Sequence, residues 1–180
     1  MTDKTDQVEL YGQHLAEKVR RFQDILRATQ FDEIVIAAGD TKIQFADDMA
    51  YPFVAHPYFR EWVPLGKRIG SYLQASSSSD RPRLFLLCVE DIWHTAPQSL
   101  PTGFEQGLEI IEYASLAELK KYLSPREGGT AYLDENNSLG VALECWKPKA
   151  VTAQIDYQLR GTTCILYTSD AAAQLTDSHL

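Results

Sequence analysis

Apolar residues recur at intervals of three and four along the first thirty positions of the chain. Charged residues, among them Glu17, Arg20 and Asp24, fill the positions between them. This spacing places the apolar side chains on one face of a helix and the charged ones on the other. The pattern predicts an amphipathic helix of several turns from about Asp6 to Gln30. Its apolar series is Tyr11, Leu15, Val19, Phe22 and Leu26.

Short apolar runs in the middle of the chain predict strands. Ile34 to Gly39 is a β-branched run that ends at glycine, which is typical of a strand buried on both faces. The run from Arg83 to Val89 is too short for an ordinary helix and too apolar for a strand with one solvent-exposed face. This pattern predicts a second central strand. Ile69 to Ala75 precedes it, across the serine-rich loop Ser76 to Ser79. We expect a hairpin in which Ile69 to Ala75 is the less buried strand.

Strand and helix patterns alternate in the second half of the chain. Leu108 to Tyr113 predicts a strand, and Ser115 to Leu123 predicts a helix that begins with a serine cap. Thr130 to Leu133 predicts a short strand, and Asn136 to Leu143 and Ala150 to Leu159 predict two more helices. This order favours an α/β domain, with a central sheet and helices packed on its faces. The order of the strands in the sheet cannot be read from the sequence.

Length and composition set broad limits. The 180 residues, of which 44% are apolar, suffice for one domain with a core. With 17 Lys and Arg against 25 Asp and Glu, the net charge of −8 leaves no broad basic face, which argues against nucleic acid as a partner. No run approaches the roughly 18 apolar residues of a membrane span, and the first residues are too polar and acidic for a signal peptide. We therefore expect a soluble, cytoplasmic protein.

The three cysteines, Cys88, Cys145 and Cys164, are predicted to be free thiols. They are widely separated and odd in number, and no two of them form a C-x-x-C pair. This pattern argues against a disulfide framework and against a zinc site.

Asp47 and Asp48 are adjacent carboxylates in the segment after the first predicted strand. Loops after central strands are where α/β proteins place ligands, so one carboxylate could face a pocket. The alternative, which the pair alone favours, is that one Asp caps a turn and the other is solvated. Because consecutive side chains point apart, the two are poorly placed to share a proton as an acid/base dyad.

His94 is the best-placed histidine for function, because Asp91 to His94 directly follows the second central strand. No His or Cys lies near it at a spacing that suits a metal, so a structural role is favoured. The segment Tyr51 to Pro64 carries five aromatic residues and three prolines in fourteen positions. It could form a subunit contact or a pocket wall, or it could fold over its own domain, and the sequence leaves both open.

Four motifs stand in order along the chain: Tyr11-x-x-His14, Phe45-Ala46-Asp47-Asp48 with Tyr51-Pro52-Phe53, His56-Pro57-x-Phe59-x-x-Trp62-Val63-Pro64, and Asp91-Ile92-Trp93-His94. Their order and spacing resemble one family, the N-terminal domain of bacterial Xaa-Pro dipeptidase, the prolidases that include the organophosphorus acid anhydrolases. The resemblance extends from about Tyr11 to Gly161 and implies a creatinase-type α/β domain with a mixed central sheet flanked by helices.

The resemblance also implies a function. Members are about two to three times longer, and a C-terminal domain binds a pair of manganese ions; this chain supplies none of those ligands, so we expect it to bind no metal and to be inactive alone. The N-terminal domain shapes the substrate pocket and a homodimer, and one of its acids, matching Asp48, reaches the pocket of the opposite subunit. The candidate substrate-binding residues are Asp48, Asp47, Tyr51, Trp93 and His94.

The likeness stops after Gly161, which divides the expected domain, residues 1–161, from a divergent tail, residues 162–180. We expect this tail to be weakly packed, and to be an artefactual or frameshifted end. Two other functions stay open. The chain could be a stand-alone, non-catalytic α/β module that dimerises or binds a partner, or a small hydrolase that uses Asp47, Asp48 or His94.

Overall fold

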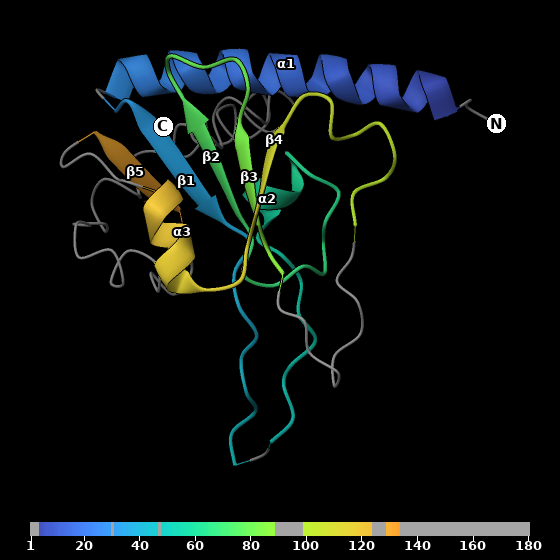
Figure 1. The fold of residues 1–180 in the computed structure, drawn as a ribbon, viewed down its shortest axis with the longest axis vertical. Helices are drawn as coiled ribbons and strands as arrows, with labels where there is room; N and C mark the ends of the chain where they lie inside the picture. The colour runs from blue at the N-terminus through green and yellow to red at the C-terminus, as the bar shows by residue number, and fades with distance from the viewer. Residues whose placement is uncertain (1–3, 30, 47, 89–98, 124–128, 134–180) are drawn as a thin grey trace, which may run out of the picture.

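A five-stranded sheet organises the protein, and a long helix runs across its strands (Figure 1). The computed structural model describes residues 4–29, 31–46, 48–88, 99–123 and 129–133. The helices are α1 (Lys4–Thr29), α2 (Pro57–Arg60) and α3 (Leu116–Tyr122). The strands are β1 (Glu33–Ala37), β2 (Tyr72–Ser76), β3 (Arg83–Leu87), β4 (Glu109–Tyr113) and β5 (Thr130–Leu133).

The sheet is mixed, and its strand order is β4-β3-β2-β1-β5. β2 pairs antiparallel with both β1 and β3, whereas β1–β5 and β3–β4 are parallel pairs. The β2–β3 pair is the predicted hairpin, joined through the serine-rich loop. Parallel neighbours cannot be joined by a tight turn, so the chain crosses over between the strands of each parallel pair. Helix α3 lies between β4 and β5 in the sequence, on the path that leads from β1 to its partner β5. The α/β class predicted from the order of the elements is therefore confirmed.

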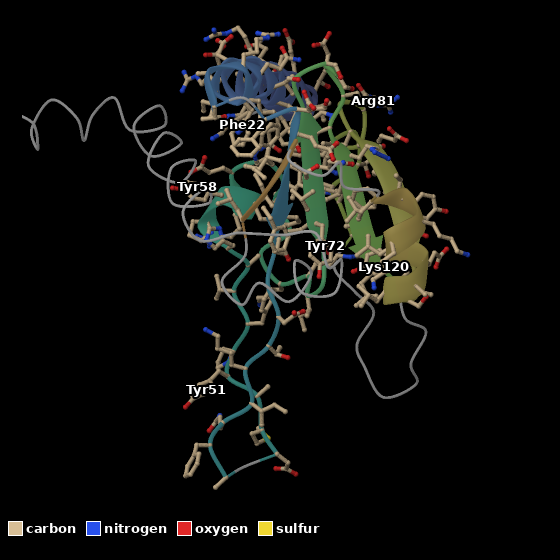
Figure 2. All side chains as sticks on the ribbon, turned by 90° about the vertical axis from the view of Figure 1, so that its left-hand side faces the viewer. Phe22, Tyr51, Tyr58, Tyr72, Arg81 and Lys120 are labelled. Carbon is tan, nitrogen blue, oxygen red and sulfur yellow. The ribbon has the colours of Figure 1, made fainter. Side chains whose placement is uncertain are left out.

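The core has one layer on each face of the sheet, because successive strand residues point to opposite sides. On one face Ile34 and Ile36 of β1 pack in a cluster with Phe22 and Leu26 of α1 and with residues around α2. On the other face the cluster contains strand residues and the two buried leucines at α3, and Figure 2 shows α2 and α3 on opposite sides of the sheet. Burial on both faces explains why β1 reads as one continuous apolar run. The second cluster comprises Val35, Ala37, Tyr72, Phe85, Tyr113, Leu119, Leu123 and Tyr132.

Most predicted elements form within a few residues of their expected bounds. The first helix, all five strands and α3 are confirmed, and Ser115 caps α3 as predicted, since its Oγ accepts a hydrogen bond from the Glu118 amide at 3.3 Å. Cys88 is a free thiol, as expected. The helices predicted at Asn136 to Leu143 and Ala150 to Leu159, Cys145, Cys164 and the tail 162–180 lie outside the described residues.

One prediction about burial is wrong. β2 is not the less buried member of its hairpin, because Tyr72, Leu73, Gln74 and Ala75 are all buried. The reason is the strand order: β1 and β3 flank β2 on both sides, and helices cover the faces around it. In the part of the chain that the structure describes, no helix combines the length and the apolar character that crossing a membrane would need.

Candidate functional site: an arm at the end of the sheet

Residues 39–54 form an arm that projects away from the sheet, on the side opposite α1 (Figure 1). Asp47 lies outside the described residues. The two legs of the arm are held by backbone hydrogen bonds, in which the Tyr51 amide donates to the Lys42 carbonyl at 2.8 Å and the Gln44 amide donates to the Met49 carbonyl at 2.9 Å. Ala46 has a φ of 58° where the chain turns. The arm is thus a narrow antiparallel hairpin that projects from the domain.

The surface of the arm is apolar to an unusual degree. Five of the ten large apolar side chains that are exposed in the described residues lie on it, and Phe45 is 99% exposed. Soluble monomers rarely gather apolar side chains in one exposed patch, and such a patch marks an interaction surface. Figure 2 shows Tyr51 far out along the arm. The five are Ile43, Phe45, Met49, Tyr51 and Val54.

Asp48 and Tyr51 are the two predicted site residues that the structure places, and both are exposed on the returning leg of the arm. Asp47, Trp93 and His94 lie outside the described residues, so their roles stay predictions. The carboxylate of Asp48 therefore sits among exposed apolar residues rather than in a pocket of its own domain. Within its own domain Asp48 is a solvated acid. It could face a ligand only if another surface covered the arm.

Backbone hydrogen bonds also connect the root of the arm to the body of the domain. The His56 amide donates to the Ala38 carbonyl at 2.8 Å, and the Gly70 amide donates to the Gly39 carbonyl at 3.2 Å. Gly39 has a φ of 99°, which a side chain would strain. A small hollow of about 110 Å³ opens beside this root; it is lined by Ala38, Gly39, Asp40, Phe53, Val54, His56 and Pro57.

The aromatic, proline-rich segment divides into an exposed part and a buried part. Tyr51 and Val54 are exposed on the arm, whereas Phe59, Trp62 and Val63 are fully buried. The second part therefore folds over its own domain. It begins with α2, which the sequence pattern had placed in a loop; Pro57 stands at the start of this helix, and the His56 side chain accepts a hydrogen bond from the Tyr58 amide.

Side chains of α1 contact the end of this buried part. Tyr11 Oη donates to the Trp62 carbonyl at 2.7 Å, and His14 Nε2 donates to the Glu61 carbonyl at 2.6 Å. The buried ammonium of Lys18 pairs with the Glu61 carboxylate. The first family motif, with Tyr11 and His14, thus has a structural role at the end of α2.

Titratable groups with displaced pKa values lie on the body of the domain. Burial raises the pKa of Tyr11 to about 12, and burial also raises the pKa of Tyr113 well above its usual range. Both hydroxyls therefore keep their protons at neutral pH and act as hydrogen-bond donors. Burial likewise raises the pKa of the Cys88 thiol, although Arg68 opposes the shift. Within the described residues, no group of three or more His, Cys, Asp and Glu side chains could hold a metal ion.

Two residues at the arm root have no counterpart among the sites predicted from the sequence. Tyr113, at the end of β4, donates a hydrogen bond from its hydroxyl to the Gly70 carbonyl, and Gly70 in turn bonds Gly39. The available signal was the pair of glycines, since one follows β1 and the other precedes β2. Nothing in the sequence pattern pairs Tyr113 with them.

Comparison with known proteins identifies the family. The sequence model of the "Xaa-Pro dipeptidase, N-terminal domain" matches residues 9–157. The chain belongs to this family. The resemblance carried by the four motifs is thereby confirmed.

Two relatives of this Xaa-Pro dipeptidase N-terminal domain are themselves Xaa-Pro dipeptidases. The chain is 28% identical over 153 residues to the Xaa-Pro dipeptidase of Serratia proteamaculans, covering 82% of the chain and 34% of the relative. It is 32% identical over 128 residues to that of Shewanella piezotolerans, covering 71% and 29%. The chain thus spans about a third of the length of these relatives. A solved structure of a Bacillus anthracis protein described as an aminopeptidase P matches with a TM-score of 0.49 at 15% identity, covering 72% of the chain and 34% of that protein.

Proposed function

We propose that this chain is the substrate-pocket and dimerisation domain of a cytoplasmic, manganese-dependent Xaa-Pro dipeptidase, which hydrolyses dipeptides that end in proline. The family match supports the enzyme class. The arm supports the role of the domain, because it carries an exposed acid and five exposed apolar side chains beyond the folded body. A surface of this kind is stabilised when another surface covers it. In this proposal that surface is the second subunit of a homodimer.

Asp48 is the residue on the arm that would contact the substrate. Its carboxylate is exposed, and the neighbouring Met49 and Tyr51 are apolar or aromatic and exposed as well. When a second subunit covers these neighbours, the carboxylate enters a less polar environment in which it needs a cationic partner. The free α-amino group of a dipeptide is such a partner. An acid at a fixed distance from the scissile bond would thus select dipeptides over longer peptides.

The manganese ions of the proposed enzyme do not fit the described residues, because these residues hold no cluster of metal-binding side chains. We assign the metal ligands to the remainder of the enzyme. The metals and the hydrolytic step accordingly belong to that remainder, whereas this chain binds and positions substrate. The 180-residue chain alone, supplied with Mn²⁺, should not hydrolyse an Xaa-Pro dipeptide; metal-dependent turnover by the purified chain would refute this assignment.

Substitution of Asp48 tests the proposal directly. Residues 1–161 can be joined to the remaining part of the Serratia proteamaculans Xaa-Pro dipeptidase and assayed with an Xaa-Pro dipeptide. A charged hydrogen bond contributes about 1.5–3 kcal/mol, so Asp48→Asn should raise KM about 10- to 100-fold while kcat changes little. Glu109→Gln, which neutralises an exposed acid on β4, is the matched control and should leave KM unchanged.

The substrate offers a second control. An N-acetylated dipeptide lacks the positive charge that Asp48 is proposed to bind. The unsubstituted fusion should therefore discriminate against it, and Asp48→Asn should remove most of that discrimination. Equal kinetics of the two fusions on both substrates would overturn the role of Asp48.

The same arm would also suit a stand-alone, non-catalytic module that dimerises or binds a partner. The exposed apolar side chains favour this alternative as much as they favour the enzyme. The genomic DNA downstream of the Gly161 codon distinguishes the two. A catalytic domain encoded there, in any frame, supports the enzyme, whereas a genuine stop codon supports the module.

A further inference from the structure

The arm leaves the sheet between two separate sets of hydrogen bonds. The first set, which we call the sheet anchor, consists of Gly39, Gly70 and Tyr113. The Gly70 amide donates to the Gly39 carbonyl at 3.2 Å, and the Gly70 carbonyl accepts from Tyr113 Oη. One residue thus uses both of its backbone polar groups to connect the first residue of the arm to the side chain at the end of β4.

The sheet anchor depends on an unusually close approach of the backbone. Gly70 has a φ of 61°, and a Cβ on it would lie 2.8 Å from Leu87 Cδ2 and 3.6 Å from Tyr113 Oη. Glycine adopts this conformation without strain, whereas a side chain here would strain the backbone and displace Leu87. The contact lets the Tyr113 hydroxyl reach the Gly70 carbonyl.

Packing holds the Tyr113 side chain in place for this contact. It is 5% exposed and packs in the cluster on the α3 face of the sheet, and it pairs in register with Leu87 of β3. Its ring centroid lies 6.5 Å from that of Tyr72. A tyrosine hydroxyl is protonated at neutral pH, and burial raises the pKa of Tyr113 further, so the hydroxyl remains a donor.

The second set, which we call the helix anchor, holds the other leg of the arm from the opposite face of the sheet. The His56 amide donates to the Ala38 carbonyl at 2.8 Å, and His56 caps the start of α2. The far end of α2 is fastened to α1 through the bond from Tyr11 Oη to the Trp62 carbonyl and through the Lys18–Glu61 pair. The two anchors share no side chain, so each can be weakened without the other.

We propose that Tyr113 is a positioning residue that fixes the direction of the arm through Gly70 and Gly39. It lies at the opposite end of this hydrogen-bonded chain from the arm and does not touch the surface that the arm presents. Loss of its hydroxyl leaves the Gly70 carbonyl buried without this donor and loosens the first leg. The consequence for substrate binding rests on the proposed function, whereas the positioning of the arm does not.

Amide hydrogen exchange measured by NMR on the ¹⁵N-labelled 180-residue chain tests this inference. Tyr113→Phe removes the hydrogen bond to the Gly70 carbonyl, which should loosen the neighbouring bond from the Gly70 amide to Gly39 and accelerate exchange at that amide by up to about tenfold, the scale of one buried hydrogen bond. The amide of His56, in the helix anchor, and that of Ile36, in the centre of the sheet, should keep their rates. Residual dipolar couplings of the Gln44 and Tyr51 amides should shrink, because the arm then samples more directions relative to the sheet.

The matched control is Tyr132→Phe. Tyr132 is also a buried tyrosine of the same cluster, but it lies on β5, at the opposite edge of the sheet from β4. It should leave Gly70 exchange and the arm couplings as they are. An unchanged Gly70 rate in Tyr113→Phe, or an equal acceleration at Gly70, His56 and Ile36, would overturn the inference, since the second result describes a tyrosine that only stabilises the fold.

Gly39→Ala perturbs the sheet anchor at its other end, where the arm begins. It provides a second test if Tyr113→Phe does not fold. The new Cβ has space, since its nearest neighbour is Phe53 Cε2 at 3.7 Å, but the φ of 99° is strained for alanine. It should also accelerate exchange at Gly70 and spare Ile36; full protection of Gly70 in this variant would overturn the inference. Neither result alters the Asp48 test, so failure of this inference and failure of the proposed function are distinguishable.

Discussion

The arm and the segment directly after it are both rich in aromatic residues, yet their surroundings are opposite. Phe45 on the arm is 99% exposed, whereas Phe59 is fully buried. The buried segment lies against α1, where the Trp62 ring meets the Phe22 ring edge to face with centroids 4.6 Å apart. Position relative to the sheet and α1, rather than residue type, therefore selects the aromatic side chains that form the core.

The largest expected effect comes from removing a ring in the buried segment. Phe59→Ala should lower the free energy of unfolding by about 3–5 kcal/mol, because it leaves a cavity at a fully buried position. Urea unfolding followed by far-UV circular dichroism measures this loss. A loss below about 1 kcal/mol would show that residues 57–63 are not part of the core.

A smaller effect is expected where α1 fastens the buried segment. Glu61→Gln removes the carboxylate that pairs with the buried Lys18 ammonium, so it should destabilise the protein by about 1–3 kcal/mol in the same unfolding assay. Glu17→Gln is the control, because Glu17 pairs with Arg20 and Arg21 on the exposed face of α1 and its loss should matter less. Equal losses in the two variants would contradict the distinction between a buried and an exposed pair.

The smallest effect on folding is expected on the arm. Phe45→Ala should change the free energy of unfolding by less than about 0.5 kcal/mol at protein concentrations where the chain is monomeric. The same substitution should weaken self-association, measured by sedimentation velocity over a concentration series, because it removes apolar surface from the proposed interface. If Phe45→Ala unfolds the protein as readily as Phe59→Ala does, the arm is part of the core and the contrast between the two segments fails.

Local patterns predicted most of the secondary structure. The spacing from Tyr11 to Leu26 predicted α1 because a helix buries one face, and Ser115 marked the start of α3 because its hydroxyl caps a free amide. Burial of β2 was predicted wrongly because it depends on which strands lie beside it, and strand order is a non-local property. Helix α2 was missed although Pro57, at its first position, is a known start signal.

The candidate site divides in the same way. The sequence pointed to Asp48 and Tyr51, and both lie on the arm, but it could not reveal that this segment leaves the domain as a hairpin. The connection from Tyr113 through Gly70 to Gly39 joins residues far apart in the chain. Such a connection leaves no periodic signal.

Most helices and strands, the α/β class and the family can all be recognised in the sequence alone, because each depends on spacing or on motifs that stand in order along the chain. The burial of particular aromatic residues, the central place of β2 and the anchoring of the arm emerge only in the folded molecule. Burial and anchoring arise from contacts between segments distant in sequence, which local spacing does not record. Phe45 and Phe59 have the same chemistry, and only the fold surrounds one of them with neighbours.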